Sequence, residues 1–113
     1  MFHNEALRDY CLGLDEVTED LPFGPDVLVF RFRKKIFALM PLDTNPPRLN
    51  LKMDPELLPD YRARYPEHVL PGYHMNKSHW NTVICVPELS AETIRWMIAH
   101  SYSLIKKSMK ANK

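Results

Sequence analysis

Glycine and cysteine are scarce in this sequence of 113 residues, which has three glycines and two cysteines. The glycines, Gly13, Gly24 and Gly72, lie too far apart to form a glycine-rich loop that cradles phosphate groups. The cysteines, Cys11 and Cys85, are too few for a disulfide framework or a four-cysteine zinc site. Both lie in stretches of apolar periodicity, so we expect two buried free thiols.

Long apolar runs are also missing, because none approaches the roughly 20 residues that cross a bilayer. The N-terminus has no basic stretch followed by an apolar one, so we expect no signal peptide, no membrane contact and a cytoplasmic location. Ser78 and His79 are adjacent, which places them poorly for nucleophilic catalysis. With 45% hydrophobic and 26% charged residues, residues 1–113 are expected to form one monomeric, non-catalytic domain without a cofactor or metal.

The net charge of +1 conceals a strong segregation of charge along the chain. Residues 1–26 contain seven acidic residues and a single basic one, Arg8. Residues 31–52 contain six basic residues and a single acidic one, Asp43. Two outcomes are open at this point: the blocks form separate acidic and basic faces, or they neutralise one another in space.

Hydrophobic periodicity predicts the elements of the first half of the chain. Apolar residues at helical spacing indicate a helix over about residues 4–13, with Asn4 as its N-cap. Two apolar runs, residues 26–32 and 36–42, flank a short basic turn and indicate a β-hairpin. Strict alternation over residues 48–52 indicates a half-buried strand.

The second half combines short elements with a long irregular segment. A helix must end by Pro66 and begins either at Asp54 or near Pro59. Residues 66–79 lack periodicity and indicate a long loop, after which residues 80–86 resume strand character.

Ser90 is the expected N-cap of a final helix that extends to about residue 108, with Leu89 and Ile94 as a hydrophobic staple. The fold expected is α+β, a two-layer α/β arrangement with an antiparallel sheet of about four to six strands and the N- and C-terminal helices on one face.

Several short motifs follow one another in an order that resembles a known family. They are LPFG (21–24), VF (29–30), IFA (36–38), NLK (50–52) with DP (54–55), PGYHMNK (71–77), HWNT (79–82) and SY (101–102). Over nearly the whole chain they resemble the MmcQ/YjbR-like family of small bacterial proteins. The resemblance implies a compact fold similar to the bacterial frataxin CyaY and a DNA-binding role with a "double wing" architecture.

The predicted DNA interface consists of the basic hairpin tip, basic residues on neighbouring strands and part of the long loop. A protein that binds the phosphate backbone of DNA needs clustered basic side chains that are long enough to reach the phosphates. The candidate residues are Arg31, Arg33, Lys34, Lys35, Arg48, Lys52, Lys77 and His79.

Two other functions are kept as alternatives. The first is iron binding by an acidic N-terminal face, by analogy with frataxin, and its candidates are Glu5, Asp9, Asp15, Glu16, Glu19 and Asp20. The second is a protein-interaction module that offers a sheet face or edge.

Four loop residues and one apolar segment are expected to have structural roles. Tyr73 and Trp80 would cover the sheet edge, while His74 and Asn76 would satisfy backbone groups of the loop. The apolar segment 21–25 is expected to pack internally.

Overall fold

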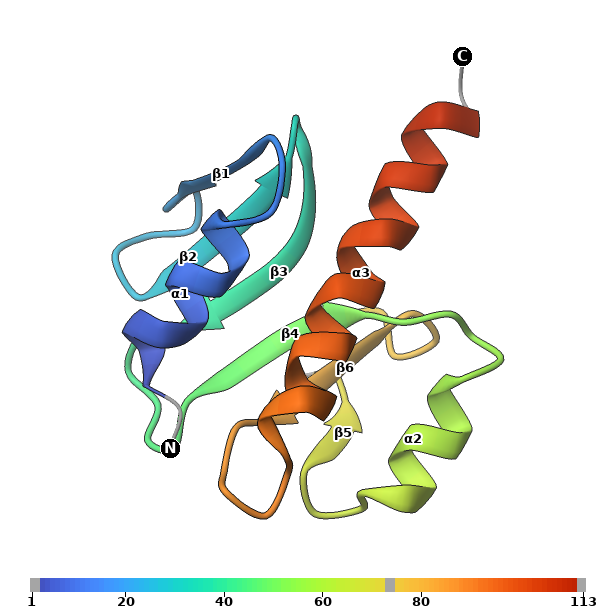
Figure 1. The fold of residues 1–113 in the computed structure, drawn as a ribbon. Coiled ribbons are helices and arrows are strands. Elements are labelled where there is room, and N and C mark those ends of the chain that lie inside the picture. The colour runs from blue at the N-terminus through green and yellow to red at the C-terminus, as the bar shows by residue number, and fades with distance from the viewer. Residues whose placement is uncertain (1–2, 73–74, 112–113) are drawn as a thin grey trace.

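The computed structural model describes residues 3–72 and 75–111 (Figure 1). The elements are α1 (Asn4–Leu12), β1 (Val17–Asp20), β2 (Val27–Phe32), β3 (Lys35–Pro41), β4 (Arg48–Lys52), α2 (Leu58–Arg64), β5 (Val69–Pro71), β6 (Trp80–Ile84) and α3 (Ala91–Ala111). The six strands form one antiparallel sheet in the order β1-β2-β3-β4-β6-β5. The predicted α+β class, with both terminal helices on one face, is therefore confirmed.

The two layers of the fold are visible in Figure 1, where α1 and α3 cross the same face of the sheet. The core lies between this face and the two helices. Alternation along β2 places Leu28, Phe30 and Phe32 in the core, and alternation along β4 adds Leu49 and Leu51. The half-buried strand predicted over residues 48–52 is confirmed.

The long helix α3 begins and packs as its sequence predicts. The Ser90 hydroxyl accepts a hydrogen bond from the Thr93 amide at 3.1 Å, which caps the first turn. Leu89 and Ile94, the predicted staple, are both buried. Further along, the Tyr102 ring meets Phe32 edge-on with 5.4 Å between ring centroids, which fixes α3 against the hairpin.

Both cysteines are buried and free, as expected. Burial raises the pKa of each thiol to about 12, because the thiolate would lose its hydration. For Cys11, the nearby Cys85 adds a smaller contribution in the same direction. Both side chains therefore remain protonated at neutral pH.

Three details of the sequence-based picture need correction. Strand β1 was not expected, and β5 falls inside residues 66–79, which were expected to be loop throughout. Asn4 is the first helical residue of α1, and His3 occupies the N-cap position without a side-chain cap. The helix before Pro66 is α2, which takes the later of the two predicted starts, with Pro59 in its first turn, where its missing amide costs no helical hydrogen bond.

Loop residues Phe23 and Met75 lie over the second face of the sheet. Val29 is completely buried and Leu39 is 7% exposed, although both project from this face. The apolar segment 21–25 was expected to pack internally, and this is wrong for Phe23, whose side chain is 65% exposed. Phe23 instead stands at the rim of a hollow on this face.

Candidate nucleic-acid interface

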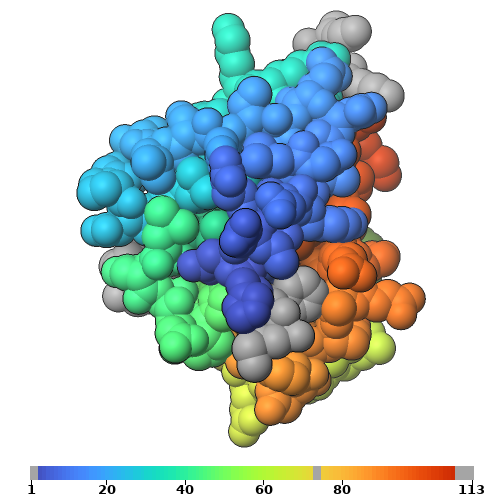
Figure 2. Space-filling view, turned by 60° about the vertical axis from the view of Figure 1, so that its left-hand side comes forward, coloured from blue at the N-terminus to red at the C-terminus, as the bar shows by residue number. Residues whose placement is uncertain are grey.

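The tip of the β2–β3 hairpin is a tight turn over Arg33 and Lys34. It stands at the top of β2 and β3 in Figure 1, and teal atoms of this part of the chain protrude at the top of Figure 2. Arg33 has φ +58°, a left-handed conformation that such turns require and that non-glycine residues rarely adopt. Its side chain is held from two sides. The guanidinium lies 3.4 Å from the Glu16 carboxylate and 5.1 Å from the centre of the Phe32 ring.

Arg31 also supports the turn. Its Nε donates to the Asp20 carboxylate at 3.0 Å, and its Nη1 donates to the Lys34 carbonyl at 3.0 Å. The antiparallel register of β1 and β2 brings these acidic and basic residues together, because it pairs Thr18 with Arg31. Arg31 and Arg33 therefore stabilise the shape of the tip, and their charges are largely compensated.

Lys34 and Lys35 complete the tip and differ from both arginines. Their side chains are exposed, and neither forms an ion pair with any described residue. Lys34 occupies the turn, and Lys35 is the first residue of β3. These two lysines are free to meet an anionic partner.

A second group of candidates lies at the same end of the sheet as the tip. Lys52 ends β4 and pairs with Trp80, the first residue of β6. The loop before β6 carries Lys77 and His79, both exposed. Strands β4 and β6 follow β3 in the sheet order, so this group belongs to the strands beside the hairpin.

Arg62 of α2 holds this loop in place and was not among the sequence-based candidates. Its Nε donates to the Asn81 side-chain oxygen at 2.8 Å, and its Nη2 donates to the carbonyls of Lys77 and Trp80. The Asn76 side chain accepts from the Ser78 amide at 2.9 Å, which confirms the structural role expected for Asn76.

No local pattern announces the role of Arg62, because its partners lie 15 to 19 residues further along the chain. Trp80, expected to cover the sheet edge, is half-buried on β6. The corresponding expectations for Tyr73 and His74 lie outside the described residues.

Arg48 lies apart from the other candidates. Leu39 pairs with Asn50 in the antiparallel β3–β4 ladder. Arg48 therefore lies toward the Pro41 end of β3, which is the end of the sheet opposite to the hairpin tip. The eight candidates thus divide into two compensated arginines, a basic end with five exposed or half-buried side chains, and Arg48 by itself.

Three of the seven acidic residues of the N-terminal segment, Glu16, Glu19 and Asp20, form ion pairs. Glu19 binds Arg8, and the hydrogen bond from Arg8 lowers the pKa of the Glu19 carboxyl. Glu16 and Asp20 face the two hairpin arginines described above. Within residues 3–72 and 75–111, no three histidine, cysteine or acidic side chains are grouped to hold a metal ion. Neutralisation in space, the second outcome left open by the sequence, therefore applies to Glu16 and Asp20, which pair with basic residues of the 31–52 block.

The fold is that of a small α+β domain with one six-stranded antiparallel sheet and the terminal helices on one face of it. The YjbR family model matches residues 12–104. This chain belongs to the YjbR family.

Two of its relatives match over most of their length. The chain is 37% identical to YbdF of Escherichia coli O157:H7 over 90% of this chain and 83% of that protein. It is 27% identical to YjbR of Escherichia coli K12 over 85% of this chain and 80% of that one. The crystal structure of Deinococcus radiodurans DR2400 superposes with a TM-score of 0.85 at 36% identity, covering 91% and 78% of the two chains.

A Pseudomonas syringae crystal structure superposes with a TM-score of 0.74 at 29% identity, covering 92% and 99% of the two chains.

In the part of the chain that is described, no helix is both long enough and apolar enough to cross a membrane.

Proposed function

We propose that this protein binds duplex DNA through its phosphate backbone, with the tip of the β2–β3 hairpin as the main contact. The observation that supports this proposal is the pair of exposed lysines, Lys34 and Lys35, which have no ion-pair partner among the described residues and stand on a projecting hairpin. Duplex DNA presents one negative charge per roughly 1.7 Å of its axis, so each lysine that reaches a phosphate releases a counterion.

The shape of the tip suits this role as well as its charge. A two-stranded β-ribbon fits the major groove of B-form DNA. The hydrogen bond of Arg31 to the Lys34 carbonyl and the ion pair of Arg33 hold the turn in one conformation. Little conformational freedom is therefore lost when the tip binds. Lys52, Lys77 and His79 lie at the same end of the sheet and provide a second row of contacts to the phosphates.

The test is the binding of a short mixed-sequence duplex, followed by fluorescence anisotropy between about 20 and 200 mM salt. The double variant Lys34→Ala/Lys35→Ala should bind more weakly at every salt concentration. It should also lower the slope of log K against log salt by up to about two units, one for each lysine that no longer reaches a phosphate. The thermal stability should remain nearly unchanged, because neither lysine forms an ion pair with a described residue.

A matched control carries the same change in net charge at a distant place. Arg64→Ala/Arg95→Ala removes two exposed arginines from α2 and the first turns of α3, far from the tip in Figure 1. This variant should keep nearly the full salt slope. Equal decreases in both double variants would show that only net charge matters and would reject the tip. Absence of binding at the lowest salt concentration would reject DNA binding itself.

A further inference from the structure

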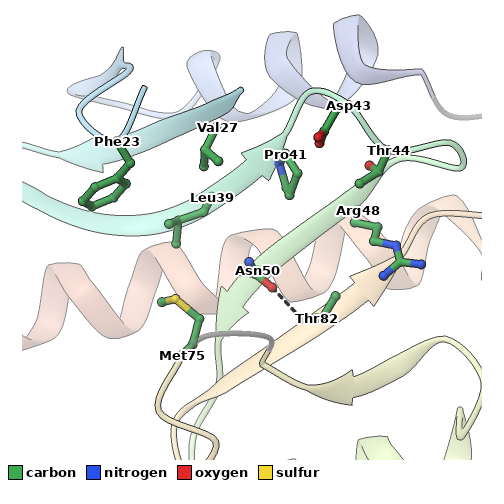
Figure 3. Close-up of a pocket in the computed structure, with 10 residues that line it drawn as sticks. All are labelled: Phe23, Val27, Leu39, Pro41, Asp43, Thr44, Arg48, Asn50, Met75 and Thr82. Atoms are coloured by element: carbon green, nitrogen blue, oxygen red, sulfur yellow. Dashed lines mark hydrogen bonds between the residues drawn. The ribbon is translucent and has the colours of Figure 1, made fainter. Parts of the chain in front are cut away.

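The second face of the sheet, which carries neither α1 nor α3, contains a cavity of about 510 Å³ (Figure 3). This volume falls within the range of small-molecule sites. The cavity lies on the strands and not at the hairpin tip, so its function is independent of the DNA-binding proposal. Arg48, the candidate that the structure separates from the basic end, lines it.

One end of the cavity is apolar. Phe23 and Met75 come from two different loops and stand on either side of Leu39 in Figure 3. Val27 and Pro41, which are paired across β2 and β3, extend this apolar floor. The exposed ring of Phe23, which no internal packing explains, is accounted for if it forms one wall of a binding site.

The other end is polar and carries both signs of charge. Asp43, Thr44 and Arg48 lie at this end in Figure 3, where the Arg48 guanidinium points away from Asp43. The Thr44 hydroxyl oxygen is buried and has no hydrogen-bond partner within the described residues, which is uncommon for a buried polar atom. Neither Asp43 nor Arg48 forms an ion pair with a described residue, and they do not pair with each other.

The register gives the scale of the site. Leu39, Asn50 and Thr82 form one row across the sheet, and the Asn50 side chain is occupied by a 2.6 Å hydrogen bond from the Thr82 hydroxyl. Pro41 and Arg48 belong to a second row, two residues further along the strands. Two residues of a strand span about 7 Å, a distance on the scale of an aromatic amino acid between its head group and the end of its side chain.

We propose that this cavity binds a free α-amino acid with an apolar side chain. The ligand carboxylate pairs with Arg48, the ammonium group pairs with Asp43, and the side chain lies between Phe23 and Met75. A ligand with a carboxylate alone would bring a second negative charge close to Asp43, and one with an ammonium group alone would face Arg48. A zwitterion provides an oppositely charged partner for both Arg48 and Asp43. The Thr44 hydroxyl can form a hydrogen bond with either the carboxylate or the ammonium group of the ligand.

The experiment is an amide-resolved NMR titration with three probes that share a phenyl ring. L-phenylalanine carries both charged groups, 3-phenylpropionate only the carboxylate and 2-phenylethylamine only the ammonium group. L-phenylalanine should give saturable shifts around residues 39–50 and 82. Each of the other probes should bind about tenfold more weakly or worse, because it loses one charge-assisted hydrogen bond.

Two variants and one control complete the test. Arg48→Met and Asp43→Asn should each weaken L-phenylalanine binding by about tenfold, while Arg95→Met, an exposed arginine on α3, should leave it unchanged. Asp43 is exposed, so its variant keeps the test valid even if loss of the half-buried Arg48 disturbs folding. Equal binding of 3-phenylpropionate and L-phenylalanine, shifts outside the cavity, or no saturation up to about 10 mM ligand would each overturn the proposal.

Discussion

The hydroxyl of Ser101 joins helix α3 to two strands of the sheet, and its removal should be among the most destabilising small changes in this protein. Ser101 is completely buried. Its Oγ donates to the Phe37 carbonyl at 2.6 Å and accepts from the Lys52 amide at 2.9 Å. The β3–β4 ladder ends at the pair of Ala38 and Leu51, so the hydroxyl bridges the strands where direct pairing stops.

The expected magnitude follows from the two backbone groups that Ser101→Ala would leave without a partner. Each unsatisfied buried group costs about 1–3 kcal/mol, so the free energy of unfolding should fall by about 2–6 kcal/mol. Domains of this size are typically stable by only about 5–15 kcal/mol. At roughly 4 °C per kcal/mol, the midpoint of thermal unfolding should fall by about 8–24 °C.

Urea unfolding followed by circular dichroism measures this loss, and Ser103→Ala is the matched control. The Ser103 hydroxyl donates only to the His100 carbonyl of its own helix, and alanine is the better helix former. We expect Ser103→Ala to change the free energy of unfolding by no more than about 0.5 kcal/mol. A difference of less than about 1 kcal/mol between the two variants would refute the bridging role of Ser101.

Two further predictions concern burial. The folded thiols of Cys11 and Cys85 have a pKa of about 12, above the value of 9.0 for an exposed thiol, so the unfolded chain loses these protons first as the pH rises. The contribution of the buried thiols to the free energy of unfolding should be complete below pH 9 and fall above it by up to about 1.4 kcal/mol per pH unit for each thiol. Urea unfolding of Cys85→Ala should therefore show a smaller decline with pH than the unchanged protein. Parallel curves of unfolding free energy against pH for the two proteins would contradict this. Gly72→Ala would place a methyl group 2.8 Å from the Trp80 Cβ and should lower stability by about 1–3 kcal/mol in the same assay, more than Gly13→Ala, whose methyl group comes no closer than 3.3 Å to its neighbours.

Elements with a strong local pattern were predictable. Alternation over residues 27–32 and 48–52 indicates which side chains enter the core, because successive residues of a strand point to opposite faces. The start of α3 was equally clear, since Ser90 caps the helix through atoms only three residues away. In both cases the information lies within one turn or one strand.

Strands β1 and β5 were not predictable for a physical reason. The sequence of β1 is Val-Thr-Glu-Asp, which is poor in apolar residues because two of its acidic side chains bind arginines. Strand β5 has three residues and ends in Pro71. Both are edge strands, and their extended form depends on pairing with β2 and β6.

The sequence by itself determined the core-facing residues, the hairpin with its basic tip and the family. Only the tertiary structure decided which charges are free. Arg31 and Arg33 are neutralised by acids 11 and 17 residues away, whereas Lys34 and Lys35 have no such partner among the described residues. The cavity beside Arg48 likewise forms only in the tertiary structure, because its lining residues come from separate parts of the chain. Coulomb attraction and packing depend on distance in space, and strand register sets that distance between residues that are far apart in the chain.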